Sequence, residues 1–201
     1  MASYRVLKRF LLYRSCLLKF QRLGFERAFS YNLGKEAGVT AEQVRKDFSF
    51  FGIKGSKRGG YDIRYLLSAI DEIFKTSDER KVIVIGMGNI GRALSNYQGF
   101  RENRINIVAG FDLDPAKTSK KYAIPVYPLD KMKEIVKEHD IRTAIIAVPE
   151  IAGQEVCDKL VDLGIKGILN FSPIILQVPD EVIVNYVNLR SELESLFFYT
   201  H

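Results

Sequence analysis

A glycine-rich segment holds the residues best suited to chemistry in this chain. Residues 86–91 read Gly-Met-Gly-Asn-Ile-Gly and directly follow a run of valine and isoleucine at 82–85. In dinucleotide-binding folds the first glycine permits a tight turn, the second lets a pyrophosphate approach and the third lets helix and strand pack closely. Free amides at the start of the next helix can bind phosphate. The predicted cofactor contacts here are Gly86, Gly88, Asn89, Ile90 and Gly91.

An acidic residue completes the pattern. Asp112 ends a second apolar run and lies twenty-one residues after Gly91. A carboxylate at this place accepts hydrogen bonds from the adenosine ribose and repels a 2′-phosphate. We therefore predict NAD(H) as the cofactor in preference to NADP(H), with Asp114 as the less favoured acceptor.

The nicotinamide half of the cofactor should lie over the carboxyl ends of the later strands. Residues 148–150 and 170–173 occupy that edge, and Tyr97 follows the helix after the glycines. We assign Val148, Pro149 and Tyr97 to this side. The prolines of these segments are equally consistent with simple strand ends.

Groups suited to catalysis or to metal binding are few. The two histidines, His139 and His201, lie in polar surroundings typical of the solvated surface, and no Tyr-x-x-x-Lys pair follows the expected sheet. Hydride-transfer enzymes need a proton relay and a substrate pocket as well as the cofactor. Cys16 and Cys157 have neither zinc-site nor disulfide-framework spacing. We expect a protein that binds the dinucleotide, is not an enzyme and holds no metal.

The N-terminal third is strongly basic. Residues 1–64 hold fourteen Lys or Arg against five Asp or Glu, a net charge of +9, whereas the whole chain is +6 and the remainder is therefore −3. This asymmetry indicates that the N-terminal part meets a polyanion such as nucleic acid. A solvated basic surface is the alternative.

The order of elements in this basic part predicts a winged helix-turn-helix. Apolar spacing indicates a first helix ending at Gly24 and a short second helix closed by Gly38. A third helix begins at Thr40, whose hydroxyl should accept from the amide of Gln43 while the Gln43 side chain reaches back to complete a capping box. Glycines then surround residues 56–58 and predict a hairpin with a basic tip.

In such a domain the third helix enters the major groove and the hairpin holds the flanking backbone. Val44, Phe48 and Phe51 recur at helical spacing and should be buried, which leaves the polar side chains facing outward. The predicted contacts with double-stranded DNA are Thr40, Gln43, Arg45, Lys46, Ser49, Lys54, Lys57, Arg58 and Tyr61.

Beyond a polar break near residues 75–80, apolar runs alternate with helical spacing, which predicts a doubly wound parallel sheet. The expected strands are 81–85, 105–111, 143–148, 167–170 and 182–187, and the expected helices between them are 90–97, 129–138 and 155–163. The fold class is therefore α/β. We divide the chain into a winged-helix domain at 1–78, a Rossmann domain at 79–187 and a C-terminal helix at 188–201.

That last helix ends in Phe198 and Tyr199, and adjacent exposed aromatic residues are not expected to remain in water. No run of eighteen apolar residues and no signal-peptide pattern is present. We therefore expect a cytoplasmic protein without a membrane partner.

Several segments also match a known family. They are 39–52, with Arg-Lys-Asp followed by Phe-Gly; 60–61; 84–94, with GxGNIGRAL; 147–149; and 168–173. Through them the chain resembles the Rex family of redox-sensing transcriptional repressors over nearly its whole length. The resemblance implies a homodimer that binds operator DNA when NAD⁺ prevails and is released by NADH. It also implies that the C-terminal helix is exchanged between subunits, with Phe198 beside the partner's nicotinamide.

Two departures from the family pattern concern the release of DNA by NADH. Residues 187–189 read Val-Asn-Leu where the family usually has Val-Asp-Leu, and Phe197 stands where a serine is usual. The missing carboxylate removes any interdomain charge pair made at that position. The basic residues of 52–61 are also spaced differently from the common family pattern.

Two other function classes remain open. Residues 80–175 resemble the coenzyme A-binding domains of acyl-CoA synthetases, so the chain could be the CoA-binding or NAD-dependent subunit of an enzyme. Asp112 and the basic N-terminal part argue against this alternative. The third class is a DNA-binding protein whose Rossmann domain serves only for dimerisation, which the intact glycines disfavour.

Overall fold

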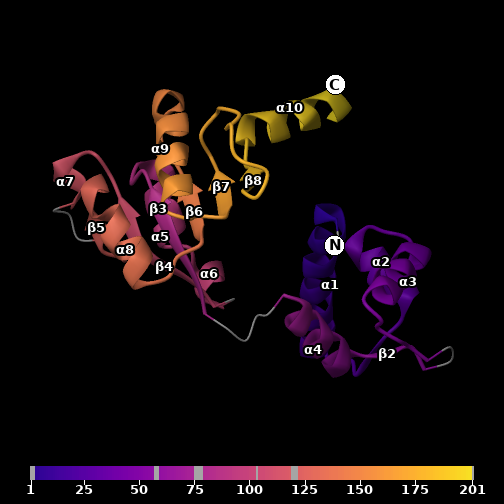
Figure 1. The fold of residues 1–201 in the computed structure, drawn as a ribbon. Coiled ribbons are helices and arrows are strands. Elements are labelled where there is room, and N and C mark those ends of the chain that lie inside the picture. Colours follow the sequence, from indigo (N-terminus) through magenta and orange to yellow (C-terminus); the bar gives the residue numbers. More distant parts are fainter. Residues whose placement is uncertain (1–2, 57–58, 75–78, 103, 119–121, 201) are drawn as a thin grey trace. The chain divides into compact units, whose positions relative to one another are not determined.

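The computed structural model describes residues 3–56, 59–74, 79–102, 104–118 and 122–200. The chain divides into two compact units, residues 1–78 and 79–201 (Figure 1). No helix in these described ranges is long and apolar enough to span a membrane.

The first unit contains four helices and a small antiparallel sheet. The elements are α1 (Tyr4–Arg22), β1 (Arg27–Ala28), α2 (Ser30–Ala37), α3 (Ala41–Phe50), β2 (Tyr61–Asp62) and α4 (Ile63–Ile73). The predicted ends of the first two helices are confirmed, because Gly24 and Gly38 adopt φ angles of 84° and 68°, which favour glycine. Helices α1, α2 and α3, together with the turn after α3 and the antiparallel β1–β2 pair, form a winged helix-turn-helix.

Two elements of this unit were missed by the sequence analysis, and one was misassigned. Tyr61 was grouped with the predicted hairpin, but it lies in β2, which pairs with Arg27 and Ala28 of β1, and the turn itself is closed by a bridge between Ser56 and Gly60. Helix α4 then begins at Ile63, where Asp62 accepts from the amide of Tyr65 at 2.8 Å. The sequence carried the signal for α4, since buried residues recur at helical spacing: Ile63, Leu66, Leu67 and Ile70.

Aromatic rings join the helices of this unit. Phe48 of α3 is fully buried and meets Phe10 and Tyr13 of α1 edge to face, with ring centroids 5.7 and 5.5 Å apart. Val44 is also buried, whereas Phe51, the cap residue of α3, is only partly so. The predicted stripe of α3 therefore docks this helix on α1 and leaves its polar side chains outward.

The second unit is built on a six-stranded parallel sheet in the order β5-β4-β3-β6-β7-β8. Its strands are β3 (Arg80–Ile85), β4 (Ile105–Phe111), β5 (Val126–Tyr127), β6 (Thr143–Ile146), β7 (Gly167–Asn170) and β8 (Ile183–Tyr186). This order is that of dinucleotide-binding Rossmann folds. The five expected strands are confirmed, although β6 and β8 are shorter than expected. The two-residue edge strand β5 is too short to give a periodic signal.

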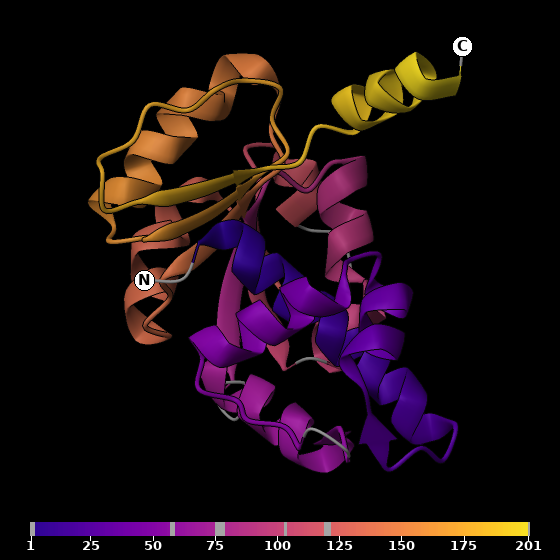
Figure 2. The same ribbon diagram turned by 90° about the vertical axis from the view of Figure 1, so that its right-hand side faces the viewer.

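Helices cover both faces of the sheet (Figures 1 and 2). The helical elements of this unit are α5 (Asn89–Ser95), α6 (Gln98–Glu102), α7 (Pro115–Thr118), a short 3₁₀ turn (Leu129–Lys131), α8 (Met132–Glu138) and α9 (Glu150–Asp162), followed by α10 (Leu189–Thr200), which does not cover the sheet. Ile83 and Ile85 of β3 pack with α8 and α9, while Val82 and Val84 face α5 and α6. Helix α9 begins five residues before the expected start, with Pro149 as its N-cap residue. Ile151 in its first turn is exposed, so this turn does not extend the buried apolar spacing of Val156 and Leu160.

Helix α10 is unlike the other helices of its unit, since none of its described residues is buried. It projects from the end of β8 and does not lie on the sheet (Figures 1 and 2). Its apolar side chains remain exposed, with Phe198 82% and Tyr199 83% accessible.

Candidate functional site

A cavity of about 670 Å³ lies at the carboxyl edge of the sheet, where β3, β4 and β6 end. Seven of the ten predicted cofactor residues line it: Gly86, Gly88, Asn89, Ile90, Asp112, Val148 and Pro149. Leu113, Ala152, Phe171 and Pro173 add apolar surface. The switch point of a doubly wound sheet, where order reverses on either side of β3, is the usual ligand site of such folds.

The three glycines of the loop serve different purposes. Gly86 has a φ angle of 94°, and a Cβ there would come within 2.5 Å of the carbonyl oxygen of Ala147. A Cβ on Gly91 would come within 2.0 Å of the Gly86 carbonyl oxygen, so this glycine allows α5 to pack on the strand. A Cβ on Gly88 would meet no atom within 4 Å. Gly88 therefore borders open space, as a position for close ligand approach requires, whereas Gly91 lies behind the cavity.

Asp112 is only 9% exposed and is held by three donors. Its Oδ2 accepts from the Met87 amide at 2.7 Å and from Lys117 Nζ at 2.9 Å, and its Oδ1 accepts from the Asp114 amide at 2.9 Å. Burial alone would raise the pKa of this carboxyl, but hydrogen bonds from Asp114, Lys117 and Met87 together lower it. The carboxylate thus ties the glycine turn to the end of β4.

Lys117 is a residue of this site that the sequence analysis missed. It lines the cavity beside Asp112 and Asp114, and its ammonium group lies against the Asp112 carboxylate. A basic residue five positions after the acidic one was the available signal. The positive charge offsets part of the repulsion that Asp112 would exert on a 2′-phosphate.

Besides Gly91, two predicted cofactor residues do not line the cavity. Tyr97 is 59% exposed and its ring packs edge to face on Phe100 at 5.0 Å, because α5 ends at Ser95 and the chain turns away. Phe198 lies on the exposed helix α10. Among the described residues, no cluster of His, Cys, Asp or Glu is suited to holding a metal ion.

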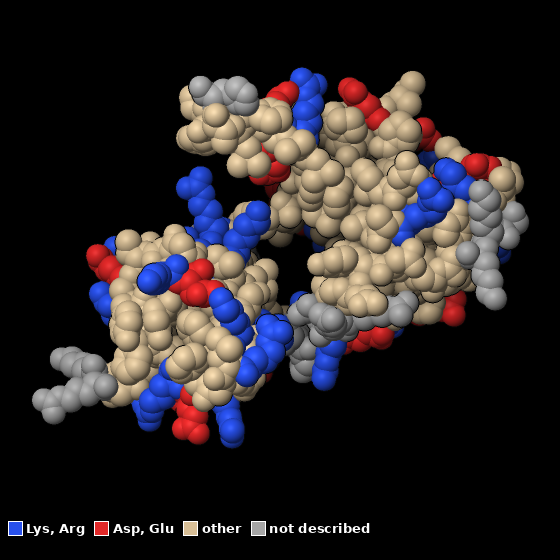
Figure 3. Space-filling model, turned by 180° about the vertical axis from the view of Figure 1, so that it is seen from behind, with Lys and Arg blue, Asp and Glu red and all other residues tan. Residues whose placement is uncertain are grey.

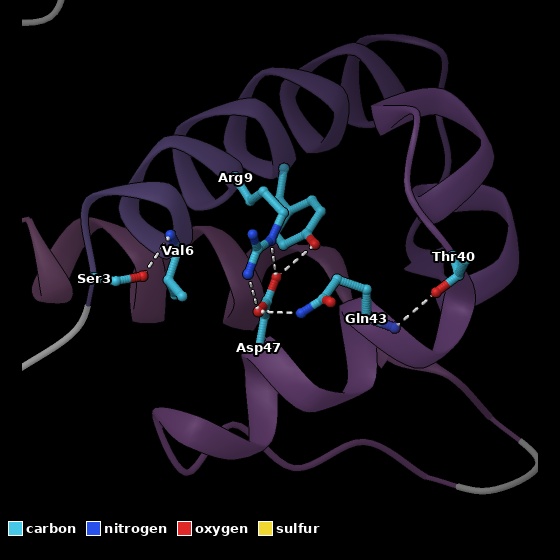
Figure 4. A network of polar contacts seen from close by, with 7 residues as sticks. Ser3, Val6, Arg9, Thr40, Gln43 and Asp47 are labelled. Atoms are coloured by element: carbon cyan, nitrogen blue, oxygen red, sulfur yellow. Dashed lines mark hydrogen bonds and ion pairs between the residues drawn. The ribbon is translucent and has the colours of Figure 1, made fainter.

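In the first unit, a buried carboxylate organises the candidate DNA-binding helix (Figure 4). Asp47 of α3 is 3% exposed and accepts from Arg9 Nε and Nη2, both at 2.6 Å, and from the Tyr13 hydroxyl at 2.8 Å. Gln43 Nε2 donates to Asp47 Oδ1 at 2.8 Å. Burial raises the pKa of Asp47, but the hydrogen bonds from Arg9, Tyr13 and Gln43 outweigh it and lower that pKa.

This network corrects one prediction and confirms another. The hydroxyl of Thr40 does accept from the Gln43 amide, at 3.1 Å, as expected. The Gln43 side chain does not reach back to the cap, because the ionised Asp47 is a stronger acceptor for its amide. Arg9, Tyr13 and Asp47 were absent from the predicted site. Their sequence signal is weak, since they are distant in the chain.

The predicted DNA contacts on α3 lie on its outer face. Arg45, Lys46 and Ser49 are exposed, and Arg45 Nη1 donates to Ser30 Oγ at 3.0 Å. Lysine and arginine outnumber acidic residues on the visible surface of this unit (Figure 3). The outward polar face of α3 is therefore one that could meet an anionic partner.

The predicted hairpin contacts are only partly described. Lys54 is exposed, whereas Lys57 and Arg58 lie outside the described residues. Tyr61 is half-buried, with its ring 5.0 Å from that of Phe48, and burial raises the pKa of its hydroxyl. Its ring thus packs β2 on α3.

Two family models match the chain. Residues 3–49 match the model described as the N-terminus of a putative DNA-binding protein, and residues 77–174 match the CoA binding domain. The redox-sensing transcriptional repressor Rex of Streptococcus pneumoniae (strain Hungary19A-6) is 37% identical over 195 residues, which cover 96% of this chain and 92% of that protein.

Solved structures extend the similarity to the whole fold. RSP, a Rex-family repressor, aligns with a TM-score of 0.90 and 30% identity over 100% of this chain and 94% of its own. RSP in complex with β-NAD⁺ and operator DNA aligns with a TM-score of 0.93 and 31% identity, over 100% of this chain and 93% of that chain. These relatives span both units, whereas the CoA-binding match covers the second alone, so the enzyme-subunit alternative is not favoured. The chain belongs to the Rex family of redox-sensing transcriptional repressors.

Proposed function

We propose that this chain binds operator DNA through its first unit, binds NAD(H) in the cavity of its second unit, and leaves the DNA when NADH replaces NAD⁺. The observation that carries the proposal is the glycine loop and acidic residue around one cavity, joined in one chain to a basic winged helix. Its relative RSP has been crystallised with β-NAD⁺ and operator DNA and also with β-NADH. Such a protein acts by binding and is not an enzyme.

Different residues of the cavity suit the pyrophosphate, the ribose and the nicotinamide of a dinucleotide. The open side of Gly88 leaves room for a pyrophosphate, and the acceptor position of Asp112 that the described residues leave unfilled suits a ribose hydroxyl. Val148 and Pro149 offer an apolar surface to the nicotinamide end. The cofactor supplies the redox state, and these side chains bind and orient it.

On the DNA side, Arg45, Lys46 and Ser49 would face the major groove and its phosphates, with Thr40 and Gln43 at the start of the helix. The hairpin residues Lys54, Lys57, Arg58 and Tyr61 would lie along the flanking backbone. Contacts to phosphate position the protein, and contacts to base edges specify the sequence.

We propose further that the working form is a homodimer in which α10 is exchanged between subunits. Several apolar side chains of this helix are exposed in its own unit: Leu189, Leu193, Leu196, Phe198 and Tyr199. Phe198 would then lie beside the partner's nicotinamide. Asn188 Oδ1 accepts from the Ser191 amide at 3.1 Å and so caps α10 without a charge.

The proposal is tested by selecting DNA from a random library with the purified protein and titrating the complex with NAD⁺ and NADH. We expect NADH to weaken DNA binding about 5- to 150-fold, the usual range of allosteric coupling, and DNA to weaken NADH binding by the same factor. Selected DNA that binds equally with and without NADH would overturn the proposal. A chain that binds DNA but no NADH would support the dimerisation-scaffold alternative.

The role of α10 is tested by deleting residues 189–201. We expect a largely monomeric protein, or one whose DNA binding ignores NADH, because reduced and oxidised cofactor differ only at the nicotinamide ring. A truncated protein that stays dimeric and is released by NADH as usual would show that helix exchange does not operate here.

A further inference from the structure

Gln43 lies in the first turn of α3, the helix that we propose enters the major groove. Its backbone amide donates to Thr40 Oγ1, and its side-chain nitrogen donates to Asp47 Oδ1 at 2.8 Å (Figure 4). The residue is half-buried, so part of its amide remains accessible. Side chains in the first turn of a recognition helix are those that reach base edges.

The charge of Asp47 sets the orientation of the Gln43 amide. Two hydrogen bonds from Arg9 and one from Tyr13 keep this buried carboxyl ionised. An ionised carboxylate has no proton to donate, so only the nitrogen end of an amide can face it favourably. The reverse orientation would set Oε1 of Gln43 against a negative charge.

The oxygen of Gln43 is consequently the end turned away from Asp47. Within the described residues no donor is bonded to this Oε1, although the Nε2 end is held. In the major groove the donors are the exocyclic amino groups of adenine N6 and cytosine N4, whereas guanine and thymine offer acceptors. The outward oxygen of Gln43 can therefore accept from adenine or cytosine but not from guanine or thymine.

We infer that Gln43 reads a base with an exocyclic amino group, adenine or cytosine, through Oε1, and that Asp47 is the residue that positions the amide. This inference rests on the proposed DNA-binding role of α3. Adenine offers a second contact, because its N7 can accept the hydrogen of Nε2 that Asp47 leaves free. Cytosine offers the amino group alone.

The experiment compares DNA selection from a random library by the full-length protein and by its Gln43→Ala variant. We expect the variant to keep most of the selected motif but to lose about tenfold preference at one position per half-site, where the unaltered protein selects adenine or cytosine. The matched control is Glu42→Ala, which alters an exposed neighbour on the same helix and should keep that preference.

Modified bases identify the group that is read. Where the selected base is adenine, replacing it by purine removes the amino group and should weaken binding about tenfold for the unaltered protein but not for Gln43→Ala. Replacing it by 7-deazaadenine removes N7 and reports the second contact. Where the selected base is cytosine, the pyrimidine analogue that lacks the amino group serves in the same way.

The positioning role is tested with Asp47→Asn, which preserves the shape of the side chain and removes its charge. We expect a loss of at least about threefold in preference at the Gln43 position, because the amide can now turn either way. Preference at the other positions should be retained, with circular dichroism verifying the fold. A general loss of DNA binding in this folded variant would overturn the positioning role.

Failure of the inference can be told apart from failure of the proposed function. A motif that is unchanged in Gln43→Ala, or a preference lost at a guanine or thymine, would overturn the inference alone. An unaltered protein that selects no motif would overturn the DNA-binding function together with the inference.

Discussion

Two buried carboxylates, one in each unit, differ in what surrounds them. Asp47 and Asp112 are 3% and 9% exposed, and the pKa of each is lowered although burial acts to raise it. Asp47 receives all of its hydrogen bonds from side chains, of Arg9, Tyr13 and Gln43. Asp112 receives two from backbone amides and one from Lys117, at the edge of a cavity.

The number of donors separates a scaffold residue from a binding residue. A carboxylate has about four acceptor positions. Asp47 receives four hydrogen bonds and is saturated by its own chain, so it joins α1 to α3 and orients Gln43 but has no acceptor position left for a ligand. Asp112 receives three and faces open space, so one position remains for a ligand. Burial and a lowered pKa alone would not have distinguished the two.

The largest effect is expected from Asp47→Ala. Removing this carboxylate leaves the guanidinium of Arg9 and the hydroxyl of Tyr13 without their acceptor, and breaking a buried ion pair in this way costs about 3–5 kcal/mol. The free energy of unfolding of the full chain, measured in urea by circular dichroism, should fall by this amount in the transition of the first unit. Asp62→Ala, which removes the exposed cap of α4, should cost only about 1 kcal/mol. Equal losses of unfolding free energy in Asp47→Ala and Asp62→Ala would contradict the structural role given to the buried Asp47.

Asp112→Ala should act mainly on the ligand. Loss of a charged hydrogen bond to the ribose should weaken NADH binding by about 1–3 kcal/mol, measured by fluorescence titration. The unaltered protein should bind NADH more tightly than NADPH, and the variant should narrow that gap. Because Lys117 offsets part of the carboxylate charge, we expect the gap to lie at the lower end of this range. Asp114→Ala is the matched control, and equal NADH and NADPH affinities in the unaltered protein would refute the assignment.

Arg45→Ala and Lys46→Ala should weaken DNA binding without lowering stability, whereas Asp47→Ala should lower stability. Both side chains are exposed on α3, so stability and NADH affinity without DNA should be unchanged. A lost phosphate contact should reduce the salt slope of DNA binding by about one, and a lost base contact should cost about 1–3 kcal/mol at one operator position. Unchanged DNA affinity in both variants would show that the protein contacts DNA through a different surface.

The sequence predicted elements whose signal is local. The strands of the sheet, the glycine loop and Asp112 were found because apolar runs, glycines and an acidic residue stand at set distances along the chain. The hydroxyl of Thr40 was correctly placed for the same reason. Strand β1 and edge strand β5 were missed because each has only two residues, too few to show the alternation of apolar and polar residues that indicates a strand.

What the sequence could not predict is pairing across the chain. Nothing near Asp47 indicates that Arg9 and Tyr13 meet it, since they lie 38 and 34 residues away. The local rule for Gln43 therefore gave the wrong partner, because a buried ionised acceptor outweighs a capping contact. The position of Tyr97 outside the cavity of its own unit was not predicted for a related reason, since α5 ends at Ser95 and the ring packs on Phe100.

The smallest expected effect is a change of stability with pH, and it follows from the lowered pKa of Asp47. A carboxyl whose pKa is lower in the folded than in the unfolded protein stabilises the fold above its unfolded value of about 3.9, and this stabilisation is lost as pH falls through the folded value. Asp47→Asn has no such group and should be less stable than the unaltered protein at neutral pH. As pH falls below about 4, the difference in unfolding free energy should shrink, by about 1.4 kcal/mol for each unit by which the pKa is lowered. Urea midpoints measured between neutral pH and the acid limit of the folded state report this difference. A gap that stays constant or widens toward acid would mean that Asp47 is not held ionised by Arg9 and Tyr13.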